Sequence, residues 1–129
     1  MFGIHLVQVG NIRKLKKVGF YKELKHGDSD GPSLEEAAGK LCLEKLEKIL
    51  LYLQSAQLLI GSPGLVNDVL NNKHVIGPLN IMTDGEWAWP SDLNYYLEKY
   101  RVSLPADFIE HMVNANWEIA QFNIDEVEL

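Results

Sequence analysis

Two pairs of carboxylates in this 129-residue chain are its side chains best suited, by type and spacing, to acid–base chemistry. Asp84 and Glu86 flank a glycine, and Asp107 and Glu110 lie three residues apart, on one side of an expected helix. A general acid and a general base need two such groups within reach of one substrate. Residues 49–129 contain eleven Asp and Glu, however, so close pairs are expected by chance and predict no reaction by themselves.

The other reactive side chains match no motif for covalent catalysis or metal binding. The histidines, at positions 5, 26, 74 and 111, form no pair at the spacing of helical metal ligands. Cys42 is the only cysteine and follows Leu41, so we expect it to be a small buried hydrophobic side chain. The GSPG sequence at 61–64 lacks the lysine of a phosphate-binding loop. We therefore predict no catalytic residues, no metal and no cofactor; a pocket of scattered carboxylates and histidines, as in a small hydrolase, is the alternative.

An acidic loop, HGDSDG at 26–31, has the beginning of a calcium-binding pattern. Asp28 and Asp30 have the one-three spacing of calcium ligands, but the fifth and twelfth positions are Pro32 and Gly39, which supply no side-chain oxygen. We interpret this loop as a solvated turn.

Charge is unevenly distributed along the chain, whose formal net charge is −6. Lys and Arg outnumber Asp and Glu by nine to seven in residues 1–48, but residues 49–129 contain three against eleven. Such an acidic body repels nucleic acid and attracts basic proteins, so we expect no nucleic-acid partner. We interpret the basic run as a solvated face; its members are Arg13, Lys14, Lys16, Lys17, Lys22 and Lys25.

Length and targeting signals indicate a single cytoplasmic domain covering residues 1–129. One cysteine allows no internal disulfide, which favours a reducing compartment. The amino terminus places apolar residues before basic ones, the reverse of a secretory signal. The longest uninterrupted apolar run, residues 49–53, is too short to cross a membrane.

The elements that would position these groups indicate an α+β fold, with helices packed on a small antiparallel sheet. Residues 78–89 have the alternation of a β-hairpin, with Asp84-Gly85 as a type I′ turn. Apolar spacing predicts helices near 42–55, 92–100 and 105–115, the second capped by Ser91. A capping box at Ser33 opens a helical region. We also expect strands over 2–9 and 20–24, a short buried strand after Gln57 and a helical turn over 65–70.

Aromatic residues are concentrated between Thr83 and Pro105, which contain two of the three Trp and three of the five Tyr. Trp87 and Trp89 would share one face of the hairpin. Such a face either packs in the core or, if exposed among acidic residues, forms an interface for a basic partner.

The same segment resembles a family of small bacterial proteins with the pattern DG-x-W-x-WP-x-DL-x-YY followed by LP-x-x-F. In this chain the first part covers Asp84 to Tyr96 and the second covers Leu104 to Phe108. The similarity spans roughly residues 20–117, and its most specific part is WP-x-DL-x-YY. The family is identified with immunity proteins of contact-dependent growth inhibition and other polymorphic toxin systems.

This resemblance implies a cytoplasmic protein that binds and neutralises a cognate toxin domain, commonly a nuclease. A nuclease holds phosphates in a basic cleft, which an acidic partner with aromatic anchors complements. We therefore expect a protein without enzymatic activity or membrane attachment that is a monomer when free; a scaffold that self-associates through its aromatic residues is a third reading. The expected partner-binding residues are Asp84, Glu86, Trp87, Asp92, Asp107 and Glu110.

Overall fold

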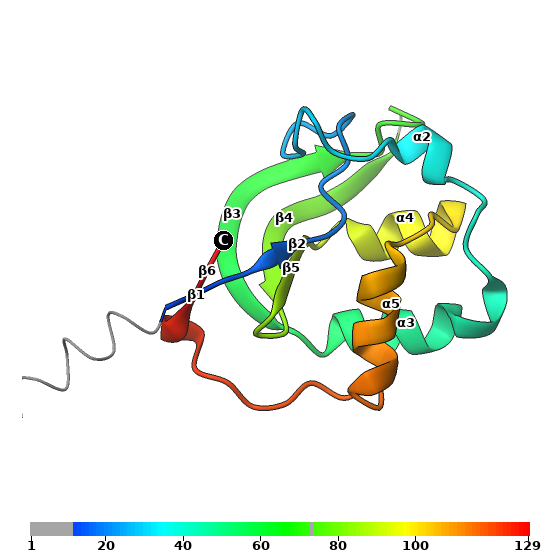
Figure 1. Ribbon diagram of the computed structural model, residues 1–129. Coiled ribbons are helices and arrows are strands. Elements are labelled where there is room, and N and C mark those ends of the chain that lie inside the picture. Colours follow the sequence, from blue (N-terminus) through cyan, green and yellow to red (C-terminus); the bar gives the residue numbers. More distant parts are fainter. Residues whose placement is uncertain (1–11, 73) are drawn as a thin grey trace, which may run out of the picture.

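The structure is a computed structural model and describes residues 12–72 and 74–129. It has the expected α+β fold, a curved sheet with its helices gathered on one side (Figure 1). The sheet has the strand order β2-β5-β4-β3, in which β2 pairs parallel with β5 and the other pairs are antiparallel. The two remaining strands, β1 and β6, pair with each other in parallel. The strands are β1 (Arg13–Lys14), β2 (Lys16–Lys17), β3 (Gln57–Asn67), β4 (Val75–Thr83), β5 (Trp87–Pro90) and β6 (Val127–Glu128).

The helices are α2 (Leu34–Ala37), α3 (Leu46–Gln54), α4 (Leu93–Tyr100) and α5 (Ala106–Asn114), with short 3₁₀ turns η1 (Leu43–Lys45) and η2 (Ile124–Glu126). They confirm the three helices expected near 42–55, 92–100 and 105–115. Ser33 caps α2 as predicted, since its hydroxyl accepts a hydrogen bond from the Glu36 N–H at 3.2 Å. None of the helices formed by the described residues is both long and apolar enough to cross a membrane.

Most of the core lies between β5 and the helices. Trp89 and Phe108 are fully buried, with ring centroids 5.6 Å apart, and Trp87 contacts the same phenyl ring at 4.9 Å. Both indoles therefore pack against α5. A smaller cluster lies apart from this core, where Ile81 and Ala88 of the sheet meet Leu15 and Phe20. Burial of the hairpin tryptophans thus holds α5 beside the turn between β4 and β5.

That turn confirms the predicted hairpin but not its predicted type. A type I′ turn needs positive φ at both central residues, and only Gly85 of the pair has one, at 98°. The Asp84 carboxylate instead shapes the turn, because its Oδ1 accepts hydrogen bonds from the Glu86 and Trp87 N–H groups at 2.9 and 2.7 Å. A side chain at Gly85 would also meet Phe122 at 2.9 Å, so both the positive φ and the lack of space require glycine there.

Ser91 does not cap α4 as expected. Asp92 is the N-cap residue, and its side chain makes no capping hydrogen bond. The Ser91 hydroxyl instead accepts a hydrogen bond from the Asn80 N–H at 2.9 Å and donates to the Pro78 carbonyl at 3.3 Å. Ser91 therefore links the end of β5 to β4 instead of capping the start of α4.

Five further expectations concern local structure and burial. The strand after Gln57 exists, but β3 is eleven residues long and largely exposed rather than short and buried. Because β3 extends to Asn67, residues 65–67 belong to a strand, and the helical turn predicted over 65–70 is wrong. The strand predicted over 20–24 is also wrong, because these residues form turns. Cys42 is exposed rather than buried, since it precedes η1 instead of lying on the inner face of α3. The strand predicted over 2–9 lies outside the described residues.

The paired tyrosines of the aromatic segment hold the loop after β3. Asp68 is fully buried, and its Oδ2 accepts hydrogen bonds from the Tyr95 and Tyr100 hydroxyls at 2.8 and 2.6 Å. Its Oδ1 accepts from the Leu70 and Asn71 N–H groups. Burial by itself would raise the pKa of the Asp68 carboxyl, but these hydrogen bonds outweigh it and lower the pKa. The Tyr96 hydroxyl accepts a hydrogen bond from the Val69 N–H at 3.0 Å, so folding explains both tyrosines of the YY sequence without a partner.

Candidate functional site

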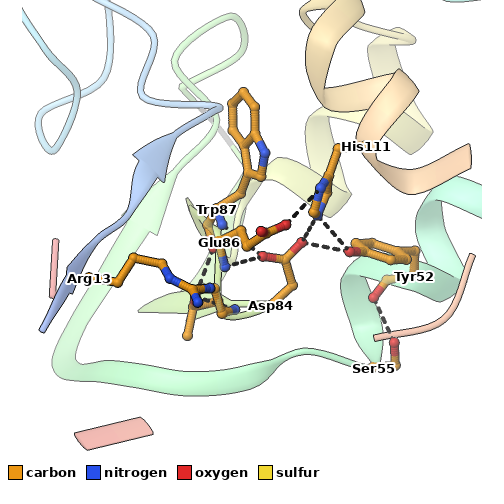
Figure 2. A network of polar contacts seen from close by, with 9 residues as sticks. Arg13, Tyr52, Ser55, Asp84, Glu86, Trp87 and His111 are labelled. Carbon is orange, nitrogen blue, oxygen red and sulfur yellow. Dashed lines mark hydrogen bonds and ion pairs between the residues drawn. The ribbon is translucent and has the colours of Figure 1, made fainter. Parts of the chain in front are cut away.

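Asp84 is at the centre of a buried polar network beside the hairpin turn (Figure 2). Its Oδ1 is occupied by the turn N–H groups, and its Oδ2 accepts a hydrogen bond from the Tyr52 hydroxyl at 2.6 Å. His111 Nε2 lies 2.8 Å from the same oxygen. The network therefore joins the hairpin turn to α3 through Tyr52 and to α5 through His111.

His111 lies between two carboxylates. Its Nε2 faces Asp84, and its Nδ1 lies 3.1 Å from Glu86 Oε2. Both ring nitrogens can donate to these oxygens at the same time only in the imidazolium form. The Glu86 side chain is 55% exposed, whereas that of Asp84 is 1% exposed. The ring thus connects a buried carboxylate to one on the surface and fixes the position of the exposed one.

The network forms one wall of an open pocket of about 350 Å³. The opposite wall comes from the segment after α5, including Glu118, Ile119 and Phe122. Asn116 and Trp117 turn the chain into this segment with left-handed φ values of 58° and 60°. Arg13 closes a further side, where its guanidinium donates to the Gly85 carbonyl at 3.0 Å. The pocket therefore carries three carboxylates, those of Asp84, Glu86 and Glu118, against one guanidinium.

The hydrogen bonds within this network leave little capacity for acid–base chemistry. Asp84 accepts four hydrogen bonds, and both nitrogens of His111 face carboxylates. Burial raises the pKa of the Tyr52 phenol, as do its hydrogen bond to Asp84 and the charges of Asp84 and Glu86, so the phenol stays protonated. Within the network, only the Glu86 carboxylate is exposed and has an oxygen, Oε1, that contacts no other member. The arrangement is suited to holding a surface carboxylate in place.

The pocket borders the most acidic part of the sequence. Residues 102–129 contain six carboxylates and no Lys or Arg. Five of these six are exposed: Asp107, Glu110, Glu118, Asp125 and Glu128. They belong to α5 and to the segment that returns across the base of the molecule to β6 (Figure 1). We call Glu86 together with these five residues the acidic surface.

The six residues expected to bind a partner are divided by the structure. Glu86, Asp107 and Glu110 are exposed and belong to the acidic surface. Taken as whole residues, Asp84 and Trp87 are 7% and 5% exposed, and Asp92 is 1% exposed. These three are therefore not surface residues of the free protein.

Asp92, the N-cap residue of α4, is buried beside a histidine. Its Oδ2 is 3.0 Å from His26 Nε2, within ion-pair distance but without the angles of a hydrogen bond, since neither side chain has a hydrogen-bonding partner. This contact brings His26, at the start of the 26–33 loop, close to the start of α4.

Two important members of the site, Tyr52 and His111, were not expected from the sequence. Tyr52 precedes Leu53 in α3, and His111 precedes Met112 in α5, where both look like ordinary members of amphipathic helices. Their meeting with Asp84 depends on the packing of two helices against the hairpin, which local spacing does not encode.

All six residues of the basic run are exposed, in agreement with its interpretation as a solvated face. Lys17 pairs with Asp28 at 2.8 Å, and the Lys16 ammonium lies 5.5 Å from the centroid of the Trp87 ring.

No group of three or more His, Cys, Asp or Glu in residues 12–72 and 74–129 is arranged to hold a metal ion. Comparisons of the chain with models of protein families, with curated proteins and with solved structures find no match.

Proposed function

We propose that this chain is a cytoplasmic immunity protein that binds and neutralises a basic toxin domain, such as a nuclease. The observation that supports this proposal is the acidic surface, which combines exposed carboxylates of α5 and the segment after it with a hairpin glutamate held by His111. Of these carboxylates, that of Glu118 lines the same pocket as Glu86. A nuclease must bind phosphates in a basic cleft. A fixed acidic surface complements such a cleft and speeds the encounter with it.

Fixing Glu86 contributes to this binding. A glutamate on a free loop would lose side-chain entropy when it pairs with a partner cation. Glu86 is already held at one oxygen by His111 and follows a turn that Asp84 shapes. Its carboxylate is therefore pre-organised, and the buried Asp84 supports binding without touching the partner.

A second candidate function is a small hydrolase. The pocket does bring together a histidine, a tyrosine and carboxylates. Binding is favoured over catalysis because His111 and Asp84 already contact each other, Glu86 and the N–H groups of the turn. They have no atom free to accept a proton from a substrate. A general base needs a free direction toward substrate.

The test is protection of cells that express a toxin domain, taken from a large secreted protein if one is encoded next to this gene. We expect the wild-type chain to restore growth and the double variant Glu86→Lys with Glu110→Lys to protect poorly, since both charges on the acidic surface are reversed. The matched control reverses two exposed carboxylates elsewhere, Asp30→Lys and Glu98→Lys, with the same change in net charge. Asp84→Lys is unsuitable because that side chain is buried.

Protection lost in the first variant and kept in the control supports the acidic surface as the binding site. Equal protection by both variants, with both folded by circular dichroism, would remove this surface from the proposal. Loss of a measured hydrolytic activity on His111→Gln, without any partner present, would favour the enzyme instead.

A further inference from the structure

The outer edge of β3 is unpaired among the described residues. β3 is the last strand in the order β2-β5-β4-β3 and pairs with β4 alone (Figure 1). It is eleven residues long. A free edge of this length presents backbone N–H and C=O groups that another strand can pair with.

This edge lacks the charged residues that usually guard an exposed strand. Neither β3 nor β4 contains a Lys, Arg, Asp or Glu, although 30 of the 129 residues (12 basic and 18 acidic) are charged. The large apolar side chains of Leu58, Ile60 and Leu65 are 54%, 47% and 67% exposed. Its protection is confined to Pro63, which lacks an N–H, and to register shifts against β4.

We propose that β3 pairs, edge to edge, with β3 of a second copy of this chain. An occupant of this edge must be extended, apolar and free of charge, and β3 itself has that composition. Antiparallel pairing about a twofold axis makes the two contacting surfaces identical, as in most symmetric dimers. No like charges then face each other across the new strand pair. This dimer departs from the monomer expected from the sequence.

The pairing centres on Leu59, within the part of β3 that precedes Pro63. Residues Gln57 to Gly61 each carry an N–H, which Pro63 interrupts further along the strand. An axis at Leu59 places Leu58 of one copy opposite Ile60 of the other, twice in the dimer. Two half-exposed aliphatic pairs are then removed from water.

Because of the net charge, dimerisation should depend on salt concentration in the opposite sense to toxin binding. Two copies with a net charge of −6 repel each other at long range, whereas their contact surface is uncharged. Added salt screens the repulsion, so dimerisation should strengthen as ionic strength rises. Binding of a basic toxin to the acidic surface should weaken under the same conditions. Failure of one proposal therefore leaves the other standing.

The experiment is sedimentation velocity of the full chain over a wide range of concentration, at low and high salt. We expect a reversible monomer–dimer equilibrium, with a dimer dissociation constant that falls as salt is added. The variant Ile60→Lys should raise this constant about tenfold, since it places a lysine at both symmetric contacts. Leu51→Lys, at a position on α3 that is 60% exposed, should leave it unchanged.

Amide hydrogen exchange gives an independent readout. The β3 amides before Pro63 that do not bond to β4 should become protected as the protein concentration rises. A sedimenting monomer at every concentration and salt would overturn the proposal. A dimer that Ile60→Lys leaves intact would also overturn it, because the interface would then lie elsewhere.

Discussion

Replacing Asp84 with Asn should destabilise the fold substantially while keeping its shape. The amide oxygen can take the place of Oδ1 and keep the two hydrogen bonds that shape the turn. The amide nitrogen then replaces Oδ2, which accepts from the Tyr52 hydroxyl and faces His111 Nε2 at 2.6 and 2.8 Å. Nitrogen cannot accept these hydrogen bonds, so two donors lose their charged acceptor in a site from which water is largely excluded.

The magnitude follows from the kind of hydrogen bond that is lost. A hydrogen bond to a charged group contributes about 1.5–3 kcal/mol, against about 0.5–1.5 kcal/mol for a neutral one. Two charged bonds are lost, and the amide recovers part of one by donating to the Tyr52 oxygen. We expect a net loss of about 3 kcal/mol, which for a domain of this size lowers the melting temperature by about 10 °C.

The assay is thermal and urea unfolding followed by circular dichroism. Asp30→Asn is the control, because Asp30 is exposed in a loop and its replacement should change stability by less than about 0.5 kcal/mol. An Asp84→Asn variant as stable as this control would refute the structural reading of the network. A variant more stable than the wild type would favour catalysis, since active-site carboxylates are commonly kept at a cost in stability.

Three further predictions concern residues that support the site. Folding lowers the pKa of the Asp68 carboxyl. Its contribution to the free energy of unfolding is therefore complete above its unfolded pKa of about 3.9 and is lost as the pH falls through the folded pKa. Asp68→Asn should therefore weaken the dependence of stability on pH in the acid range. Ser91→Ala should cost about 1 kcal/mol in urea unfolding, because the Asn80 N–H loses its acceptor. Trp89→Ala should cost about 3–5 kcal/mol in thermal unfolding, because the indole is fully buried; a loss below about 1 kcal/mol would contradict that packing.

The sequence predicts the framework of the fold because the framework is local in origin. The stripe through Ile49 and Leu53 and the one through Leu93 and Leu97 are helical by spacing, and their inner residues are buried. The alternation through Trp87 and Trp89 likewise predicts a strand, since both indoles pack on one side.

Errors arise where side chains find partners distant in sequence. Ser91 has the features of a helix cap, yet its hydroxyl bonds to β4, eleven residues earlier. Asp84 looked like a surface acid because its turn is polar, but Tyr52 and His111 approach it from two helices and bury it. Glu86, Asp107 and Glu110 remain exposed as expected.

The most direct test of the proposed function is the rate of association with the toxin domain measured by stopped flow as ionic strength is raised. Charges on the acidic surface act over about 10 Å at 0.1 M salt, and over shorter distances at higher salt. We predict that the association rate constant falls steeply with salt, and that Glu86→Lys with Glu110→Lys lowers it at low salt. An association rate that is independent of salt and unchanged in this variant would contradict the acidic surface as the binding site.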